Sequence, residues 1–486
     1  MDAGLKQKTI SGIIWSFAQR FGVMLITFCA NIVLARLLSP DDFGCIGMLM
    51  IFILIANTFI DGGFGSALIQ KKQPTQDDYS TIFYWNLFIS VILYVILLYL
   101  SPLIAKFYDI PLLSPVLRTQ GLVLILNSFS VIQQNRLRKQ LQFKKLAIIN
   151  LISASASLLI TIYLAYIGYG VWALVAQQLM ISLFNAVLFW IIGKWWPSFV
   201  FSLRSFKELF SFGGFLLLSN LINTFCNNIQ GLLIGKYFSP YTMGLYSQAK
   251  KLEEVASTSI SCIVDQVSYP VLSEVQDDKE KLQKVLKGLT TSIAFFSFPI
   301  MLLLIVIAKP LIVLLYSERW VECVPYFQIL CIAGLAISLQ NINYYAVAAI
   351  GKSKSLFNWT LVKRITSIIL IVAGFCINGI YGLLCGMVIA SYSIYLINSA
   401  LASKYIGYTL RAQLRDLLPV ISVSILSLLI PVAISFLLPS GLLNLTLTSL
   451  TYITTYLCLS KIFIKSKIAM LKEIIGSIIK RNNRHE

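Results

Sequence analysis

Five polar residues recur at helical spacing inside a stretch that is otherwise largely apolar. They are Lys250, Glu254, Ser257, Ser261 and Asp265. Steps of four, three, four and four residues place all of them on one stripe of a helix. A charge at the centre of a bilayer costs at least about 2.5 to 3.5 kcal/mol, so in a membrane this stripe must face protein or water. It forms either an internal Lys250–Glu254 ion pair or a cavity wall, and the adjacent Lys251 and Glu253 favour the cavity wall.

Amide side chains interrupt the preceding apolar stretch. They are Asn220, Asn223, Asn227, Asn228 and Gln230, many of them three or four residues apart. Such amides either bond one membrane helix to another or line a polar cavity. Asn31, in the first apolar stretch, has the same two interpretations. We place Asn31, Asn220, Asn223 and Asn227 in the candidate cavity.

Cations also lie within apolar stretches of both halves of the chain. Arg20 is in the first stretch, and Lys363 with Arg364 lies about two turns inside a later one. Together with Lys250 and Lys251 they suit a substrate with two or three negative charges, such as a diphosphate. Snorkelling of these long side chains toward the membrane surface remains an alternative.

Two acidic residues are candidates for coupling to an ion gradient or for a hinge. Asp61 begins the sequence DGGFG, whose glycines permit bending or close approach of a helix. Asp265 lies at the corresponding place in the second half of the chain. A proton or a sodium ion is the expected coupling ion, and no other cofactor is expected.

Covalent and metal chemistry have no signal in the sequence. The sole histidine, His485, lies near the polar C-terminus, and the nine cysteines are scattered without CxxC spacing. We interpret the cysteines as small apolar residues of the membrane interior. A Walker A loop is also missing from the sequence, so we expect no ATP hydrolysis by this chain.

Composition defines the elements that must position these residues. Of 486 residues, 58% are hydrophobic and 12% are charged, and the mean hydropathy is +0.81. Ordinary soluble domains carry about 25% charged residues, so the sequence predicts an all-α polytopic membrane protein. Stretches of about 20 or more apolar residues, each able to span a bilayer, number about fourteen. We take the first as a retained helix, because it is far longer than the core of a signal peptide.

The net charge of +19 comes from basic residues whose positions along the chain indicate the membrane topology. Lysine and arginine gather in the connectors that follow even-numbered spans and at both termini, whereas the other connectors hold essentially only Arg319. By the positive-inside rule, both termini and all the basic connectors face the cytoplasm. The cations form no continuous face, so no nucleic-acid partner is expected.

A motif near the end of the first span occurs twice. LARLLSPDDFGCI (34–46) and IGKYFSPYTMGLY (234–246) share a cation, a Ser-Pro step and a glycine. Proline ends one helix and a second helix follows, so each copy predicts a helical hairpin. SPLIAKFY (101–108) matches KPLIVLLY (309–316), and YGVWAL (169–174) matches YGLLCG (381–386).

The repeat predicts two parallel six-helix bundles. We expect an N-lobe at 1–200, a C-lobe at 201–410, two additional helices at 411–466 and a basic cytoplasmic tail at 467–486. An even number of helices gives both lobes the same orientation, with a pseudo-twofold axis along the membrane normal. Transporters with a central cavity are built in this way.

Several runs resemble one family. RLLSPDDFG (36–44), DGGFGSALIQKK (61–72), QLQFKK (140–145), YGVWALV (169–175) and YPVLSEVQDD (269–278) are similar to the polysaccharide flippases (Wzx-like) of the multidrug/oligosaccharidyl-lipid/polysaccharide (MOP) exporter superfamily. The resemblance implies a MATE-like fold, alternating access and transfer of an undecaprenyl-diphosphate-linked oligosaccharide to the outer leaflet of a bacterial inner membrane. Gradient coupling is common in that superfamily. Relatives that flip the peptidoglycan precursor use cavity arginines, for which Arg20 is the nearest counterpart.

The expected function is therefore transport of a lipid-linked oligosaccharide. We expect the transporter to be a monomer, with polysaccharide polymerase and glycosyltransferase machinery as possible partners. Two alternatives stay open: a multidrug or cation antiporter of the same superfamily, and a membrane polysaccharide polymerase or ligase. Cations in the candidate cavity argue against a cationic drug. Short connectors on the outer side argue against the enzyme, which would need a large outer loop.

Overall fold

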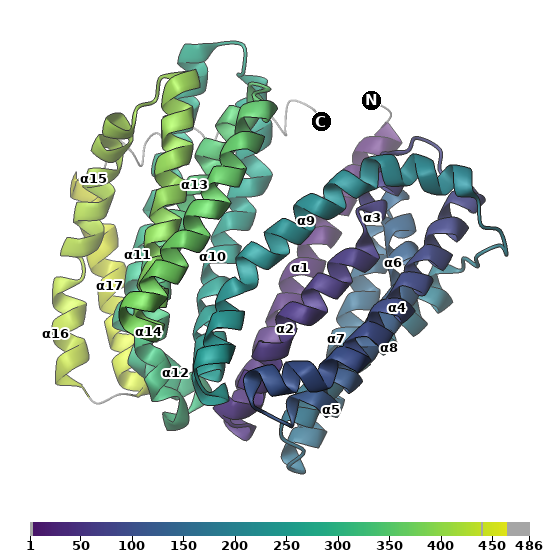
Figure 1. Cartoon of the computed structure of the whole chain (residues 1–486). Helices are drawn as coiled ribbons and strands as arrows, with labels where there is room; N and C mark the ends of the chain where they lie inside the picture. Colours follow the sequence, from purple (N-terminus) through teal and green to yellow (C-terminus); the bar gives the residue numbers. More distant parts are fainter. Residues whose placement is uncertain (1–2, 439–440, 464–486) are drawn as a thin grey trace. The chain divides into compact units, whose positions relative to one another are not determined.

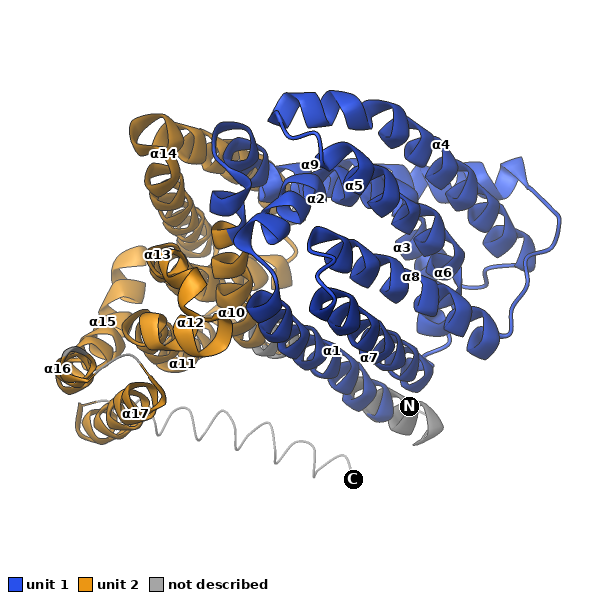
Figure 2. Cartoon of the chain, turned by 90° about the horizontal axis from the view of Figure 1, so that it is seen from below, with its two compact units in different colours: residues 1–244 blue, residues 245–486 orange. Residues whose placement is uncertain are grey.

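The computed structural model describes residues 3–438 and 441–463, without the side chains of residues 3–10, 13, 262–267, 353 and 436. All regular elements of this described part are helices (Figure 1). Contacts divide the chain into two compact units, Met1–Gly244 and Leu245–Glu486 (Figure 2). The predicted all-helical class is confirmed.

The first unit contains nine helices and the first turn of a tenth. Their bounds are α1 Ala3–Leu37, α2 Pro40–Asp61, α3 Phe64–Gln70, α4 Gln76–Tyr108, α5 Leu113–Gln120, α6 Leu122–Lys139, α7 Phe143–Tyr166, α8 Val171–Gly193 and α9 Leu203–Tyr237. Helix α1 packs on α7, α7 on α8, α8 on α6 and α6 on α4. Helix α9 packs on α2, which places it in the first compact unit.

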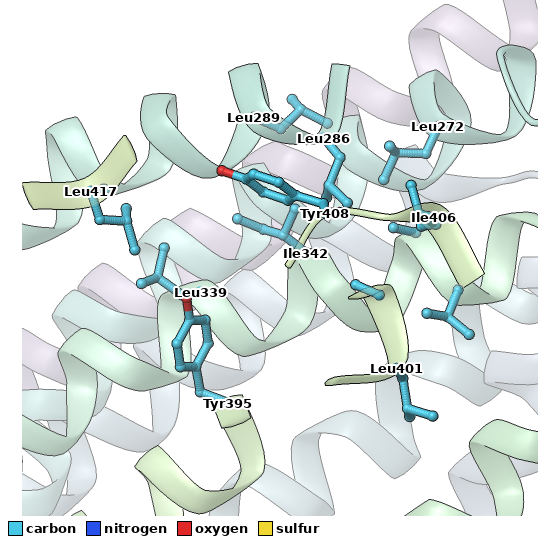
Figure 3. Close-up of a cluster of buried hydrophobic side chains, with 14 of the residues drawn as sticks. Leu272, Leu286, Leu289, Leu339, Ile342, Tyr395, Leu401, Ile406, Tyr408 and Leu417 are labelled. Atoms are coloured by element: carbon cyan, nitrogen blue, oxygen red, sulfur yellow. The ribbon is translucent and has the colours of Figure 1, made fainter. Parts of the chain in front are cut away.

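The second unit begins within α10. Its elements are α10 Pro240–Glu274, α11 Lys279–Val306, α12 Ala308–Tyr316, the 3-10 helix η1 Glu318–Cys323, α13 Val324–Ala349, α14 Ser353–Ile406, α15 Leu410–Leu426, α16 Leu429–Leu437 and α17 Leu442–Phe463. Helix α11 packs on α13 and α15, and α13 packs on α14. Tyr395, Tyr408, Leu286 and Ile342 belong to the buried apolar core that these helices share (Figure 3).

The number of membrane spans is consistent with the predicted fourteen. Twelve described segments are long and apolar enough to cross a bilayer. One of them, Lys354–Ile406, is a hairpin, because Asn378 and Gly379 have non-helical backbone angles inside α14. The charged helix α10 is 35 residues long and is not among the twelve. Counting both halves of α14 and adding α10 gives the predicted number.

The two copies of the Ser-Pro motif begin helices in the same way. Ser39 caps α2 and forms a capping box with Asp42, and Ser239 accepts a hydrogen bond from the Thr242 backbone N–H of α10 at 3.3 Å. Proline has no backbone N–H, so at the first helical position it leaves no hydrogen-bond donor unsatisfied. The predicted break between two helices is therefore present in both copies, and local sequence explains it.

The first turns of α2 and α10 cross at their glycines, within the first unit. A Cβ atom at position 44 would lie 1.8 Å from the Pro240 carbonyl oxygen, and one at position 244 would lie 1.9 Å from that of Pro40. Only glycine permits two backbones to approach so closely. The repeated motif therefore packs against its own copy.

Equivalent helices pair in equivalent ways in the two halves of the chain. The α4–α6 pair corresponds to α11–α13, and the α6–α8 pair corresponds to α13–α14. Tyr108 and Tyr316, which close the matched PLI segments, are both buried. The lobe boundary after residue 200 stays a prediction, as does the 467–486 tail, which lies outside the described residues.

Candidate functional site

The polar stripe of α10 contains the ion pair that its spacing allows. Lys250 Nζ lies 3.7 Å from a Glu254 carboxylate oxygen, with side chains 27% and 52% exposed. Lys251 is exposed, whereas Ser257 is buried. Asp265 lies on the backbone of α10, but its side chain falls outside the described residues. The ion-pair interpretation and the cavity interpretation are compatible here, because the pair stays accessible.

Glu253, which the sequence only suggested as part of a wider polar face, is buried in this helix. Its side chain is 5% exposed, and its carboxyl group hydrogen-bonds Ser257 one turn later. The other oxygen, Oε1, has no hydrogen-bond partner and would lie 2.8 Å from a Cβ atom at position 334. Gly334 of α13 lies beside this oxygen, and the Met301 side chain of α11 lies against the same glycine. Glycine at position 334 thus makes room for a carboxyl group between three helices.

Lys363 is buried in the second unit, on the first half of α14. The residue is 7% exposed, and its Nζ donates to Asn398 Oδ1 at 2.9 Å. Asn398 donates in turn to the Gln340 carbonyl at 2.9 Å, and the ammonium lies 5.4 Å from the centre of the Tyr344 ring. No carboxylate forms an ion pair with Lys363 within the described part of the chain. Its positive charge is therefore balanced only by dipoles and a ring face.

The amides of α9 divide into two groups. Asn228 and Gln230 donate to carbonyl groups of their own helix, Thr224 at 2.8 Å and Asn227 at 2.6 Å respectively. Asn220 and Asn227 are exposed on α9, and Asn223 is half-buried. The assignment of Asn220, Asn223 and Asn227 to a polar cavity stays a prediction.

The remaining candidates of the first unit lie on α1 and at the end of α2. Arg20 is exposed and Asn31 is buried on α1. Asp61 ends α2, where Gly62 and Gly63 take left-handed backbone angles and break the helix before α3. The Asp61 and Asn135 side chains converge over Gly65. The bend predicted from DGGFG is present, and Asp61 lies directly at it.

The candidate residues are shared between the two compact units. Arg20, Asn31, Asp61, Asn220, Asn223 and Asn227 belong to the first, and Lys250, Lys251, Glu254, Lys363 and Arg364 belong to the second. The described residues contain no group of three or more His, Cys, Asp or Glu side chains that could hold a metal.

Solved structures with the same fold are membrane transporters. The inward closed conformation of the lipid II flippase MurJ aligns with a TM-score of 0.76 at 16% identity, covering 94% of this chain and 100% of that one. An inward-facing multidrug resistance MATE family transporter of the MOP superfamily aligns with a TM-score of 0.59 at 15% identity, covering 79% and 94%. The protein therefore has the same fold as these two transporters, which is the predicted fold of the MOP superfamily.

Sequence comparison gives the family. The family described as polysaccharide biosynthesis protein matches residues 33–325, and the chain belongs to it. Teichuronic acid biosynthesis protein TuaB of Bacillus subtilis (strain 168) is 27% identical over 357 residues, which are 73% of this chain and 74% of TuaB. Lipopolysaccharide biosynthesis protein WzxC of Escherichia coli (strain K12) is 26% identical over 415 residues, 84% of each chain. The predicted Wzx-like relationship is confirmed.

Proposed function

We propose that the protein flips an undecaprenyl-diphosphate-linked oligosaccharide from the inner to the outer leaflet of a bacterial inner membrane by alternating access. The oligosaccharide is the repeat unit of an O-antigen, a capsule or an exopolysaccharide. Membership of a polysaccharide biosynthesis family and a flippase fold support this substrate class.

Lys363 is the observation that carries the proposal. A lysine ammonium has three donors, and the described structure assigns one of them to Asn398. A cation this deeply buried needs a negative partner, because an unpaired charge is costly in a low-dielectric environment. A diphosphate supplies that partner through charge-assisted hydrogen bonds. In this proposal the buried cation forms part of the recognition site for the group that joins sugar to lipid.

The other candidates divide between the diphosphate and the sugar. Arg20, Lys250, Lys251 and Arg364 supply further positive charge, with Glu254 keeping Lys250 in place. Amide groups donate and accept, as sugar hydroxyls do, so Asn31, Asn220, Asn223 and Asn227 are assigned to the oligosaccharide. The prenyl tail stays in lipid throughout.

A proton or sodium gradient is proposed to drive the cycle. Asp61 and Asp265 are the candidates from the sequence, and the structure adds Glu253. Its Oε1 has no hydrogen-bond partner and lies beside Gly334 of α13, which makes this buried carboxyl group a third candidate to bind the proton or sodium ion. Release of the proton then requires that water or a cation reach Glu253.

The proposed setting follows from the charged connectors. Both termini face the cytoplasm under the positive-inside rule. The transporter acts as a monomer beside the glycosyltransferases that assemble the repeat unit and the polymerase that extends it.

Reconstitution tests the function directly. Purified protein is placed in liposomes that contain a fluorescent undecaprenyl-diphosphate oligosaccharide, and a membrane-impermeant reagent measures the fraction in the outer leaflet, with and without ion gradients. We expect transfer that needs the protein and accelerates with a proton or sodium gradient. Absence of transfer for every O-antigen, capsule and exopolysaccharide repeat unit tested would overturn the proposal.

A multidrug or cation antiporter is the second candidate, and Glu253 is the observation that favours it. A buried carboxyl group whose Oε1 has no hydrogen-bond partner suits a cationic substrate as well as a proton. Efflux of a cationic dye from cells that express the protein distinguishes the two. Dye efflux without oligosaccharide transfer would support the antiporter.

A further inference from the structure

The connector between α8 and α9 has an unusual composition for a segment outside helices (Figure 1). Together with the first residues of α9 it reads KWWPSFVFSLRSFK over 194–207, with two tryptophans, three phenylalanines, three cations and no acidic residue. Residues 194–202 lie between the two helices. A purely water-exposed loop would not be expected to be so aromatic, and a lipid-buried one would not be expected to be so basic.

Hydrogen bonds hold this connector in one conformation against α4 and α6. The Ser80 hydroxyl accepts from the Ser198 backbone N–H at 3.0 Å, and Thr81 Oγ1 accepts from that of Ser202 at 3.0 Å. Gln133 of α6 donates to the Trp195 carbonyl at 2.7 Å. In a helix, backbone N–H and C=O groups hydrogen-bond to one another. In this connector, side chains of the neighbouring helices form those hydrogen bonds instead.

Gln76 and the ring of Trp195 complete this attachment. Gln76 donates to the Trp196 carbonyl at 2.7 Å and accepts from Trp195 Nε1 at 2.6 Å. Trp195 is 5% exposed and meets the Tyr79 ring edge-on at 6.1 Å. The conformation is thus set by the protein, and the direction of each neighbouring side chain is fixed with it.

The next aromatic side chains are directed outward. Trp196 is 72% exposed, Phe199 is 99% exposed and Phe201 is 48% exposed. Lys194, Arg204 and Lys207 flank them and are also exposed. Over the described part of the chain, none of these three cations pairs with a carboxylate. One surface therefore presents three aromatic rings beside three unneutralised positive charges.

We propose that this surface, made by Trp196, Phe199, Phe201, Lys194, Arg204 and Lys207, binds acidic phospholipid headgroups. Non-helical backbone is not tolerated in contact with hydrocarbon, which excludes a deeper position. Aromatic rings prefer the headgroup layer, where one edge is apolar and the other wet. Clusters of lysine and arginine select anionic lipids there. The surface is an interfacial anchor that keeps α8 and α9 at a fixed depth, independently of the transported molecule.

Lipid retention tests the charge selectivity. The full-length protein is purified from mixed micelles of phosphatidylglycerol and phosphatidylcholine, and native mass spectrometry measures which lipid it retains. The triple variant Lys194→Gln, Arg204→Gln and Lys207→Gln should lose preference for phosphatidylglycerol by about tenfold or more. A control triple variant of exposed lysines, Lys279→Gln, Lys284→Gln and Lys404→Gln, removes the same charge elsewhere. Equal losses in both variants would overturn the proposal, because the preference would then follow net charge.

Fluorescence quenching tests the depth. The protein is placed in nanodiscs whose lipids carry bromine either near the glycerol or near the end of the acyl chain. Bromine near the glycerol should quench the fluorescence of Trp196, and bromine near the chain end should not. The variant Trp196→Phe should therefore lack this quenched emission. Phe199→Ser, which alters a fully exposed ring, should weaken phosphatidylglycerol retention without changing the melting temperature. If bromine does not quench Trp196, this surface lies in water and the assignment is overturned. If Phe199→Ser changes the protein from dimer to monomer, a second copy of the chain covers this surface, and the assignment is likewise overturned.

Discussion

Gly44 lies against the carbonyl group of Pro240, so that a Cβ atom at position 44 would be 1.8 Å from its oxygen. The carbonyl belongs to backbone and has no flexible side chain with which to yield. We expect Gly44→Ala to force the first turns of α2 and α10 apart and to lower the free energy of unfolding by about 1 to 3 kcal/mol. Thermal unfolding of the purified protein measures this loss.

Gly231→Ala is the control for that substitution. Its new methyl group would meet the end of the Met243 side chain at 3.5 Å and the Gly47 carbonyl oxygen at 4.0 Å, which are ordinary van der Waals distances. We expect its melting temperature to equal that of the natural protein. Equal melting of the two alanine variants would show that the crossing does not need glycine.

Lys363→Gln tests the buried cation. Glutamine can still hydrogen-bond Asn398, but it cannot neutralise a diphosphate, so we expect oligosaccharide transfer to fall by about 10- to 100-fold. Protein abundance in the membrane should persist, since removing a buried charge also removes its desolvation cost. Lys354→Gln, at an exposed position of the same helix, is the control. Normal transfer by Lys363→Gln would remove this residue from the site.

Arg20→Ala and Lys250→Ala test the accessible cations. We expect each to abolish surface polysaccharide while the protein stays in the membrane, as immunoblotting of membrane fractions would show. The pair with Glu254 contributes only about 0.3 to 0.5 kcal/mol, because the two residues lie one helical turn apart and the Glu254 carboxylate is exposed. The exchange Lys250→Glu with Glu254→Lys keeps the pair and moves the charge. Full recovery of polysaccharide in the exchanged variant would mean that the pair is structural only.

Glu253→Gln tests the coupling proposal. Glutamine resembles the protonated carboxyl in shape and cannot release a proton, so transfer should become insensitive to the ion gradient. Dicyclohexylcarbodiimide, an apolar reagent for protonated carboxyl groups, should label Glu253 in the natural protein, as peptide mass spectrometry would detect. Glu322→Gln, in the exposed part of η1, is the matched control. Gradient-dependent transfer by Glu253→Gln would exclude this residue as the coupling group.

Gln413→Leu tests how α15 is joined to the second unit. Gln413 exchanges hydrogen bonds with Asn343 at 3.1 and 3.2 Å and accepts from the Tyr395 hydroxyl at 2.9 Å, all fully or nearly fully buried. Leucine would leave these partners unsatisfied, at a cost of about 1 to 3 kcal/mol. Chemical denaturation should report that loss, and Gln73→Leu in an exposed connector should show none. An unchanged unfolding curve would make α15 a loosely attached helix.

Local features of the fold were predictable because short sequences determine them. Ser39 and Pro40 end one helix and begin the next through their own backbone chemistry, and Gly62 and Gly63 allow a bend that other residues resist. The Lys250–Glu254 pair follows from spacing on one helix. These predictions need no information about distant parts of the chain.

Burial in the site was not predictable, because it depends on helices far away in the sequence. Glu254 was the favoured acid of α10, yet Glu253 is the one that α11 and α13 enclose. Lys363 was expected, but its partner Asn398 was not, since the hairpin within α14 brings the two together. The interruptions between α5 and α6, α11 and α12, and α15 and α16 likewise have no clear signal in the apolar runs that contain them.

The hairpin of α14 has a practical consequence for anyone who tags, labels or divides this chain. Its turn consists of Asn378 and Gly379, and just beyond it a Cβ atom at Gly374 would lie 2.2 Å from the Gly382 carbonyl oxygen. An inserted epitope or protease site at residue 378 would therefore force apart two helices that touch through their backbones. A split reporter or an affinity tag has a better place in the exposed residues Lys72 and Gln73, where the chain already runs outside helices.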